Sequence, residues 1–223
     1  MSLQEIRIEK MYDLEETIAK DLFAGKTYPW EVLPWIHDFI LQLGPKLNKE
    51  EYRQVGEDVW IAKTAIVAPT ADIHGPCIIG KCAQIRHCAF IRENAIVGDG
   101  ATVGNSTELK NVILFNKVEV PHYNYVGDSV LGYKAHMGAG AITSNVKADR
   151  KPVVIHGTDF ALETGMYKLG AMLGDWAEIG CNSVLNPGTI VGTCSNIYPL
   201  SSVRGVVPPN CIYKNKNEII QKR

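Results

Sequence analysis

The feature that most constrains how this chain can fold is an aliphatic residue that recurs every six positions. The first unbroken run consists of Ile61, Val67, Ile73, Ile79, Ile85, Ile91, Val97, Val103 and Leu109, and the second of Leu173, Ile179, Leu185, Val191, Ile197 and Val203. A small residue, most often alanine, serine or threonine, usually stands two positions earlier. Helical faces recur about every 3.6 residues and strand faces every two, so neither element explains a period of six. A hexad does fit a short strand followed by a turn, with one side chain directed inward.

Three hexads close a triangular coil, and successive coils stack at the strand spacing of about 4.8 Å. The inward aliphatic side chains then form columns that fill a narrow interior, while the small residues fit the corners. The sequence therefore predicts an all-β fold, a single-stranded parallel β-helix over residues 58–212 with roughly seven or eight coils.

Residues 144–170 break the hexad rhythm, and residues 213–223 follow the β-helix as an expected C-terminal tail. Insertions in a solenoid lie on one face, which often binds ligands. This insertion is basic, because it contains Lys147, Arg150, Lys151 and Lys168. We expect an inserted loop with a binding role; the alternative is a solvated loop that is basic by chance.

Residues 1–57 predict a short N-terminal helical cap over the first open coil. Asp13, with an acid three residues later, resembles a capping box at the start of a first helix. A second helix is expected up to Gly44-Pro45, which would stop it. The alternative is that the aromatic residues of this segment form part of a partner or ligand surface; they are Tyr28, Trp30 and Trp35.

The composition argues against several classes of function. The formal net charge of -1 gives no global attraction to nucleic acid or to an anionic membrane. No run of about 18 apolar residues predicts a transmembrane helix, and no signal-peptide core is present. The six cysteines form no Cys-x-x-Cys pair, so we expect reduced thiols in a cytoplasmic protein.

Three stretches carry a more specific pattern than the hexads: GNSTELK at 104–110, PHYNYVGD at 121–128 and GAGAITSN at 138–145. Together with Ile91-Arg92, they resemble the acetyltransferase domain of the bifunctional N-acetylglucosamine-1-phosphate uridyltransferase/glucosamine-1-phosphate acetyltransferase. The stretch YKLGAMLGDWAEIGCNSVLNPGTIVG at 167–192 is similar to the C-terminal domain of the archaeal sugar-1-phosphate nucleotidyltransferase/acetyltransferase. The resemblance covers roughly residues 55–207 and implies that the β-helix is left-handed.

The resemblance implies a role for each matched residue. His122 matches the catalytic base, which must remove a proton from an amino-sugar nitrogen before that nitrogen attacks a thioester. The substrate-binding residues that it implies are Arg92, Lys110, Tyr125, His136, Asn145 and Lys151. The residues expected to contact acetyl-CoA, along the later coils near 160–205, are Arg204 and Lys168.

A plain structural role stays open for most of these residues. His122 is alternatively a structural histidine on a corner of the coil, and Tyr125 a packed aromatic residue. Arg92 and Lys110 are alternatively solvated surface charges. Asn145 is alternatively a residue that suits a left-handed turn.

The chain departs from the family pattern at three positions. His136 stands where the bacterial proteins have a substrate-binding asparagine, and Val146 replaces a tyrosine. Val154 occupies the place of a second archaeal lysine. In addition, residues 1–57 contain no glycine-rich nucleotide loop, so we expect no nucleotidyltransferase chemistry from them.

We therefore expect an acetyl-CoA-dependent N-acetyltransferase acting on a hexosamine 1-phosphate or a related amino sugar. Acetyl-CoA would be the co-substrate, and no metal would be required. The resemblance further implies a homotrimer with acetyl-CoA bound between subunits, and we expect neither a nucleic-acid nor a membrane partner.

Three alternatives stay open. One is a non-catalytic nucleotide-sugar- or CoA-binding or assembly module related to UDP-N-acetylglucosamine pyrophosphorylase. Another is acylation of a different amine or hydroxyl. The third is a zinc trimer resembling the γ-class carbonic anhydrases, although the histidines match no known ligand spacing; they are His74, His87, His122, His136 and His156.

Overall fold

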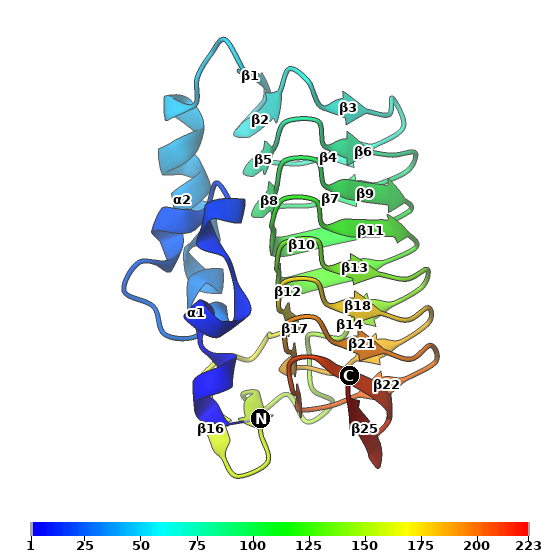
Figure 1. Cartoon of the computed structure of the whole chain (residues 1–223). Coiled ribbons are helices and arrows are strands. Elements are labelled where there is room, and N and C mark those ends of the chain that lie inside the picture. The colour runs from blue at the N-terminus through cyan, green and yellow to red at the C-terminus, as the bar shows by residue number, and fades with distance from the viewer. Residues whose placement is uncertain (1, 223) are drawn as a thin grey trace.

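The computed structural model describes residues 2–222, and its main body is a three-sided parallel β-solenoid (Figure 1). Each coil contributes a short strand to each side, and the strands of one side pair in parallel from coil to coil. We number the sides 1, 2 and 3 in chain order and name each edge by the sides that it joins. The predicted parallel β-helix is therefore confirmed, with seven complete coils and an eighth that covers only sides 1 and 2 in the described residues; its left-handed winding stays a prediction.

The strands are short because a side has room for only a few residues before the next corner. Side 1 consists of β2 (Val59–Ala62), β5 (Cys77–Ile79), β8 (Ala95–Val97), the second halves of β10 (Glu108–Leu114) and β12 (Tyr125–Leu131), β17 (Ala171–Leu173), β20 (Thr189–Val191) and β23 (Val206–Val207). Side 2 consists of β3 (Ile66–Val67), β6 (Gln84–Ile85), β9 (Thr102–Asn105), β11 (Glu119–His122), β13 (His136–Met137), β18 (Glu178–Ile179), β21 (Asn196–Ile197) and β24 (Cys211–Asn215). Side 3 consists of β4 (Asp72–Ile73), β7 (Phe90–Ile91), the first halves of β10 and β12, β14 (Ile142–Thr143), β19 (Val184–Leu185) and β22 (Ser202–Val203).

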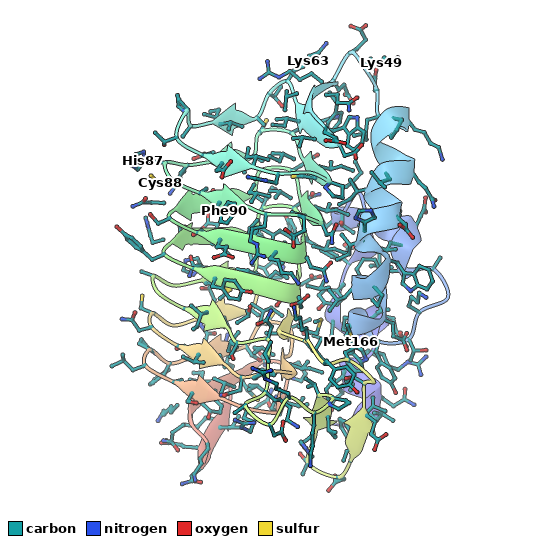
Figure 2. All side chains as sticks on the ribbon, turned by 180° about the vertical axis from the view of Figure 1, so that it is seen from behind. Lys49, Lys63, His87, Cys88, Phe90 and Met166 are labelled. Carbon is teal, nitrogen blue, oxygen red and sulfur yellow. The ribbon has the colours of Figure 1, made fainter. Side chains whose placement is uncertain are left out.

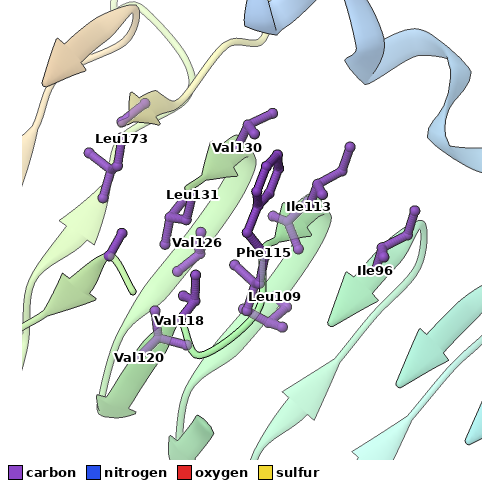
Figure 3. Close-up of a cluster of buried hydrophobic side chains, with 14 of the residues drawn as sticks. Ile96, Leu109, Ile113, Phe115, Val118, Val120, Val126, Val130, Leu131 and Leu173 are labelled. Atoms are coloured by element: carbon purple, nitrogen blue, oxygen red, sulfur yellow. The ribbon is translucent and has the colours of Figure 1, made fainter. Parts of the chain in front are cut away.

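The predicted aliphatic columns fill the interior of the solenoid. Leu109 and Val126, for example, are paired one coil apart and are both fully buried (Figure 3). Each such side chain contributes roughly 1.5–3 kcal/mol through burial. The corners are closed by residues with a left-handed backbone, as at Cys82, Cys88 and Asn94, whose φ angles are 55, 55 and 57°.

Variation in the length of the coils is confined to edge 3–1. Six residues separate successive inward aliphatic positions at the other two edges, and also between Ile91 and Val97 at this one. In the next two coils the step falls to five, because β10 and β12 each turn the edge as one continuous strand. The inserted segment 144–170 leaves the solenoid at the same edge and returns to it before β17.

Two segments expected to be irregular contain antiparallel strands. In the insertion, β15 (Val154–His156) pairs with β16 (Ala161–Glu163), and a bridge between Val146 and Lys168 closes the base of this hairpin. At the C-terminal end of the solenoid, β24 turns back into β25 (Glu218–Gln221). The residues expected to form a tail are therefore paired up to position 221.

The N-terminal segment lies along side 1 and not, as expected, over the first open coil (Figure 1). Its Asp13 N–H donates to Asp175 Oδ2 at 2.7 Å, and Tyr12 packs on Phe115 with 5.1 Å between ring centroids. The reason lies in the outward residues of side 1, which are apolar and buried: Trp60, Ile78, Ile96, Ile113, Val130, Met172 and Ile190. A sheet with two apolar faces needs a cover on both.

Most of this cover is made of short 3-10 helices. They are η1 (Leu3–Ile6), η2 (Leu14–Glu16), η3 (Lys20–Phe23), η4 (Pro29–Trp35) and η5 (Gly44–Lys46), with α1 (Ile8–Met11), α2 (Ile36–Leu43) and a first strand, β1 (Tyr52–Gly56), that pairs antiparallel with β2. The expected second helix is confirmed over α2, which ends at Leu43 just before Gly44, whereas its expected first turn at Val32 and Leu33 lies in the 3-10 helix η4. The expected first helix is wrong: Thr17 is extended, and the Glu16 carbonyl accepts a hydrogen bond from Asn116 of the solenoid instead. No helix in residues 2–222 is long and apolar enough to span a membrane.

Gly104 in β9 tests how closely neighbouring coils pack beside the strand that ends at His122. A Cβ atom on Gly104 would lie 1.6 Å from the carbonyl oxygen of Pro121, so any side chain would push the two coils apart. We predict that Gly104→Ala lowers the free energy of unfolding by about 1–3 kcal/mol or more, measured by urea denaturation. Gly56→Ala is the matched control, because its Cβ would meet nothing closer than 3.8 Å. Equal losses in the two variants would contradict this account.

Candidate functional site

A buried carboxylate, Asp128, organises a polar network at edge 3–1. Its side chain is 4% exposed and accepts three hydrogen bonds from the two neighbouring coils: from Lys110 Nζ at 3.2 Å and Asn111 Nδ2 at 3.0 Å in the coil before it, and from Asn145 Nδ2 at 2.5 Å in the coil after it. Buried charges are stable only when they are paired and hydrogen-bonded, and this one is both. The corner itself is tight, since Asp128 has a φ of 48°. The network therefore fixes the relative positions of the three coils at this edge.

Tyr125 extends the network across side 3. Its hydroxyl accepts a hydrogen bond from Asn145 Nδ2 at 3.2 Å, and its ring covers Gly127, where an added Cβ would lie 2.5 Å from the Tyr125 Oη. Burial raises the pKa of the Tyr125 hydroxyl, and the nearby carboxylates of Asp128 and Glu108 raise it further. The phenol is therefore held neutral and available as a hydrogen-bond donor.

Arg92 lies one coil before Lys110 and is already paired with acidic residues. Its Nη1 is 3.1 Å from Glu108 Oε1, and its Nε is 3.7 Å from Glu93 Oε2. The hydrogen bond with Glu108, followed by the charge of Glu93, raises the pKa of Arg92 above its ordinary value. Because 39% of the Arg92 side chain is exposed, these are surface ion pairs, which are weak and can exchange partners.

His122 ends β11 at edge 2–3, with its side chain exposed and not directed into the interior. Both of its backbone groups are hydrogen-bonded: the N–H donates to Asn124 Oδ1 at 3.1 Å, and the carbonyl accepts from the Gly140 N–H at 3.0 Å. Within residues 2–222 its imidazole ring has no hydrogen-bond partner. Edge 2–3 lies on the flank opposite the helices, where Figure 2 marks it with His87 and Cys88, two coils earlier.

The other residues implied by the resemblance lie outside this network in a single chain. His136 is on side 2, with Nδ1 2.9 Å from Glu178 Oε2. Lys151 and Lys168 are exposed in the insertion, and Arg204 is exposed at edge 3–1, where it donates to Asn186 Oδ1 at 3.2 Å. One chain therefore brings Lys110, Tyr125 and Asn145 together, with Arg92 one coil away.

Sequence reasoning missed three residues that organise the site. Asp128 was within the stretch PHYNYVGD, but its burial depends on the shortened corner of β12. Glu108 faces Arg92 only because β7 and β10 are in register. Asn124 had a visible signal, since it occupies the small-residue position of its hexad.

Within residues 2–222 no group of three or more His, Cys, Asp or Glu side chains is arranged to hold a metal ion. Of the five histidines considered for a shared zinc site, His87 and His122 share edge 2–3 two coils apart, whereas His136 lies on side 2. The zinc alternative therefore finds no ligand set within the described part of one chain.

The fold and the site define a β-solenoid of hexapeptide repeats with a polar network at one edge. A family model described as the GMPPB C-terminal domain matches residues 73–167. A protein of Methanococcus maripaludis named bifunctional protein GlmU is 30% identical over 199 residues, which are 88% of this chain and 48% of that protein. A bifunctional sugar-1-phosphate nucleotidylyltransferase/acetyltransferase of Sulfurisphaera tokodaii is 34% identical over 94 residues, 42% of this chain and 23% of that protein.

These similarities confirm the resemblance inferred from the sequence. The chain spans less than half the length of either relative. Among solved structures, the acetyltransferase domain of PglB from Neisseria gonorrhoeae in complex with acetyl coenzyme A matches at a TM-score of 0.36 and 16% identity, covering 74% of this chain and 57% of that one. The protein PerB from Caulobacter crescentus, in complex with CoA and GDP-perosamine, matches at a TM-score of 0.34 and 16% identity, covering 84% of this chain and 66% of that one.

The Asp128 network generates a prediction about stability. Asp128→Ala leaves the Lys110 ammonium, 18% exposed, without its counter-charge and removes the acceptor of two amides. We expect the free energy of unfolding to fall by about 3–5 kcal/mol, measured by chemical denaturation. Lys110→Met should lower it less, because Asn111 and Asn145 still donate to the carboxylate. A larger loss in Lys110→Met than in Asp128→Ala would show that the carboxylate is not the organising group.

Proposed function

We propose that this chain is an acetyl-CoA-dependent N-acetyltransferase whose acceptor is a hexosamine 1-phosphate or a related amino sugar. The observation that carries the proposal is the placement of His122: its ring is exposed and has no hydrogen-bond partner in the described chain, and its backbone is fixed next to the side that carries Tyr125. The similarity to the relatives named above supports an acyl transfer on a sugar.

In this proposal His122 acts as the general base. An amino sugar is mostly protonated at neutral pH, and its nitrogen becomes nucleophilic only after it loses a proton to the imidazole. The nitrogen then bonds to the thioester carbonyl carbon, the carbon–sulfur bond breaks, and the leaving CoA thiolate takes the proton from the imidazolium. The oxyanion needs a donor. The Gly140 N–H is already used by the His122 carbonyl, so another group serves.

The two cations implied for phosphate binding have different environments, and we assign them different tasks. Arg92 is partly exposed and paired at the surface, so a phosphate dianion could displace its glutamate partners and form a bidentate contact. Lys110 is mostly buried and forms an ion pair with Asp128, so its main task is to stabilise the arrangement of the coils at edge 3–1. Tyr125 and Asn145 would donate hydrogen bonds to the sugar hydroxyls or accept hydrogen bonds from them.

We propose that the complete site forms between chains of a homotrimer. His136 on side 2 and Lys151 in the insertion lie outside the network of one chain, so a neighbouring chain would have to supply them. A flat side of a triangular prism suits cyclic packing. Acetyl-CoA would then run along the later coils, where Arg204 and Lys168 are exposed.

The test of the proposed base is a free-thiol release assay with acetyl-CoA and a panel of amino sugars and their 1-phosphates. We expect turnover by the wild-type chain and a loss of at least about 100-fold in His122→Ala, with CoA binding retained in a thermal-shift assay. The matched control is His87→Ala, two coils away on the same edge, which should stay active. A fully active His122→Ala would remove the base assignment. A CoA-induced thermal shift in a wild type without turnover would instead select the non-catalytic alternative.

Mixing two inactive variants tests the shared site. If a neighbouring chain supplies His136 to the site of His122, mixed trimers of His122→Ala and His136→Ala chains contain some sites with both native residues. We expect an equimolar mixture to regain about a quarter of wild-type turnover after joint refolding, because random association leaves about one site in four with both native residues. Absence of recovery in a mixture shown by light scattering to be trimeric would contradict the placement of the site between chains.

A further inference from the structure

One position of the hexad departs from the pattern in the coil that carries His122. At edge 2–3, the position two residues before the inward aliphatic is occupied from coil to coil by Ala71, Ala89, Thr107, Asn124, Ala141, Ser183 and Ser201. Six of these residues are small. Asn124 is larger and more polar, yet it is only 2% exposed. A buried amide at a position reserved for a small side chain needs a physical reason.

The Asn124 side chain makes three hydrogen bonds to two neighbouring corners, which use both of its donors and one acceptor position. Its Oδ1 accepts from the His122 N–H at 3.1 Å. Its Nδ2 donates to the carbonyls of Gly138 and Ala141, both at 2.9 Å, in the next coil. This arrangement fixes the orientation of the amide, because the two carbonyls can face only the NH₂ group and the N–H only the oxygen.

The same side chain thus holds His122 from both directions. It binds the His122 N–H directly. It also ties down the turn from Gly138 to Ala141, whose Gly140 N–H donates to the His122 carbonyl at 3.0 Å. Asn124 therefore fixes the peptide groups on both sides of the His122 Cα. It thereby also fixes the direction of the Cα–Cβ bond that carries the imidazole.

Holding the coils together does not require an asparagine. At the equivalent position two coils later, the Ser183 hydroxyl donates to the Tyr198 carbonyl at 3.1 Å. One coil earlier, the Thr107 hydroxyl donates to the Val120 carbonyl at 3.0 Å. A single hydroxyl therefore supplies the contact between coils, and the bond to the N–H of the histidine is what asparagine adds.

We propose that Asn124 is a positioning residue that sets the orientation of the His122 imidazole for proton transfer. This inference rests on the proposed role of His122 as the base. Misplacement of a reacting group by about 1 Å lowers rates by about 100-fold, so a rigid corner has a direct effect on turnover. Asn124 does not touch substrate and acts only through His122.

The informative variant is Asn124→Ser, because serine is the residue that the solenoid itself uses at positions 183 and 201. The hydroxyl can keep a bond to the next coil, as Ser183 does, while the His122 N–H loses its acceptor. We expect kcat to fall about 10- to 100-fold while KM for acetyl-CoA changes less than about twofold. Hydrogen-exchange mass spectrometry on peptides spanning 119–123 should show about tenfold faster exchange of the His122 amide. Ser183→Ala is the matched control, and both its kcat and this exchange rate should match the wild type.

Unchanged kcat and unchanged exchange in Asn124→Ser would overturn the proposal. So would equal losses of activity and of melting temperature in Asn124→Ser and Ser183→Ala, because that result assigns the residue a purely structural role. If the wild type transfers no acetyl group but the His122 amide still exchanges faster in the variant, the acyltransferase function fails while the placement of His122 by Asn124 stands. The exchange measurement thus separates the two failures.

Discussion

The structure depends on the packing of one inward aliphatic side chain per hexad against the same position in the coils above and below. Leu109 and Val126 illustrate the contact, since they are paired in register and fully buried. A column of this kind leaves no freedom for a coil to rotate relative to its neighbours, because any rotation would expose apolar surface. Residues on the outside of the solenoid therefore occupy a lattice whose spacing is set by the interior.

The spacing between coils sets the distances between the residues of the candidate site. Asp128 accepts from Lys110 in the coil before it and from Asn145 in the coil after it, and their spacing is that of hydrogen-bonded strands. His122 stands across side 3 from this network, and its backbone is held by Asn124. A site built in this way would need little reorganisation before the proposed acyl transfer, which favours electrostatic and positional effects in catalysis.

The solenoid could be predicted because the hexad is a local pattern with a direct geometric meaning. The expected first helix failed because Glu16 bonds to the solenoid, and such tertiary contacts override local capping patterns. The site was predictable only in part, because its residues come from different coils and meet only through the register in which the strands of neighbouring coils pair. Tyr125 and Asn145 were expected to share a substrate, and a hydrogen bond joins them. The pairing of Lys110 with Asp128 was not foreseen, since it depends on whether each corner has five or six residues.

The confinement of length changes to edge 3–1 has a consequence for how such molecules can diversify. At two edges, six residues always separate successive inward aliphatic positions, so changes of length at the third edge leave the packing of the interior columns unaltered. Shortening at β10 and β12 and the addition of segment 144–170 both occur there, and Asp128, Asn145 and Arg204 occupy it. The molecule thus combines a constant core with one edge that tolerates changes of length. Loops can be gained or lost at this edge, and ligand preference changed, without any change in the packing of the core.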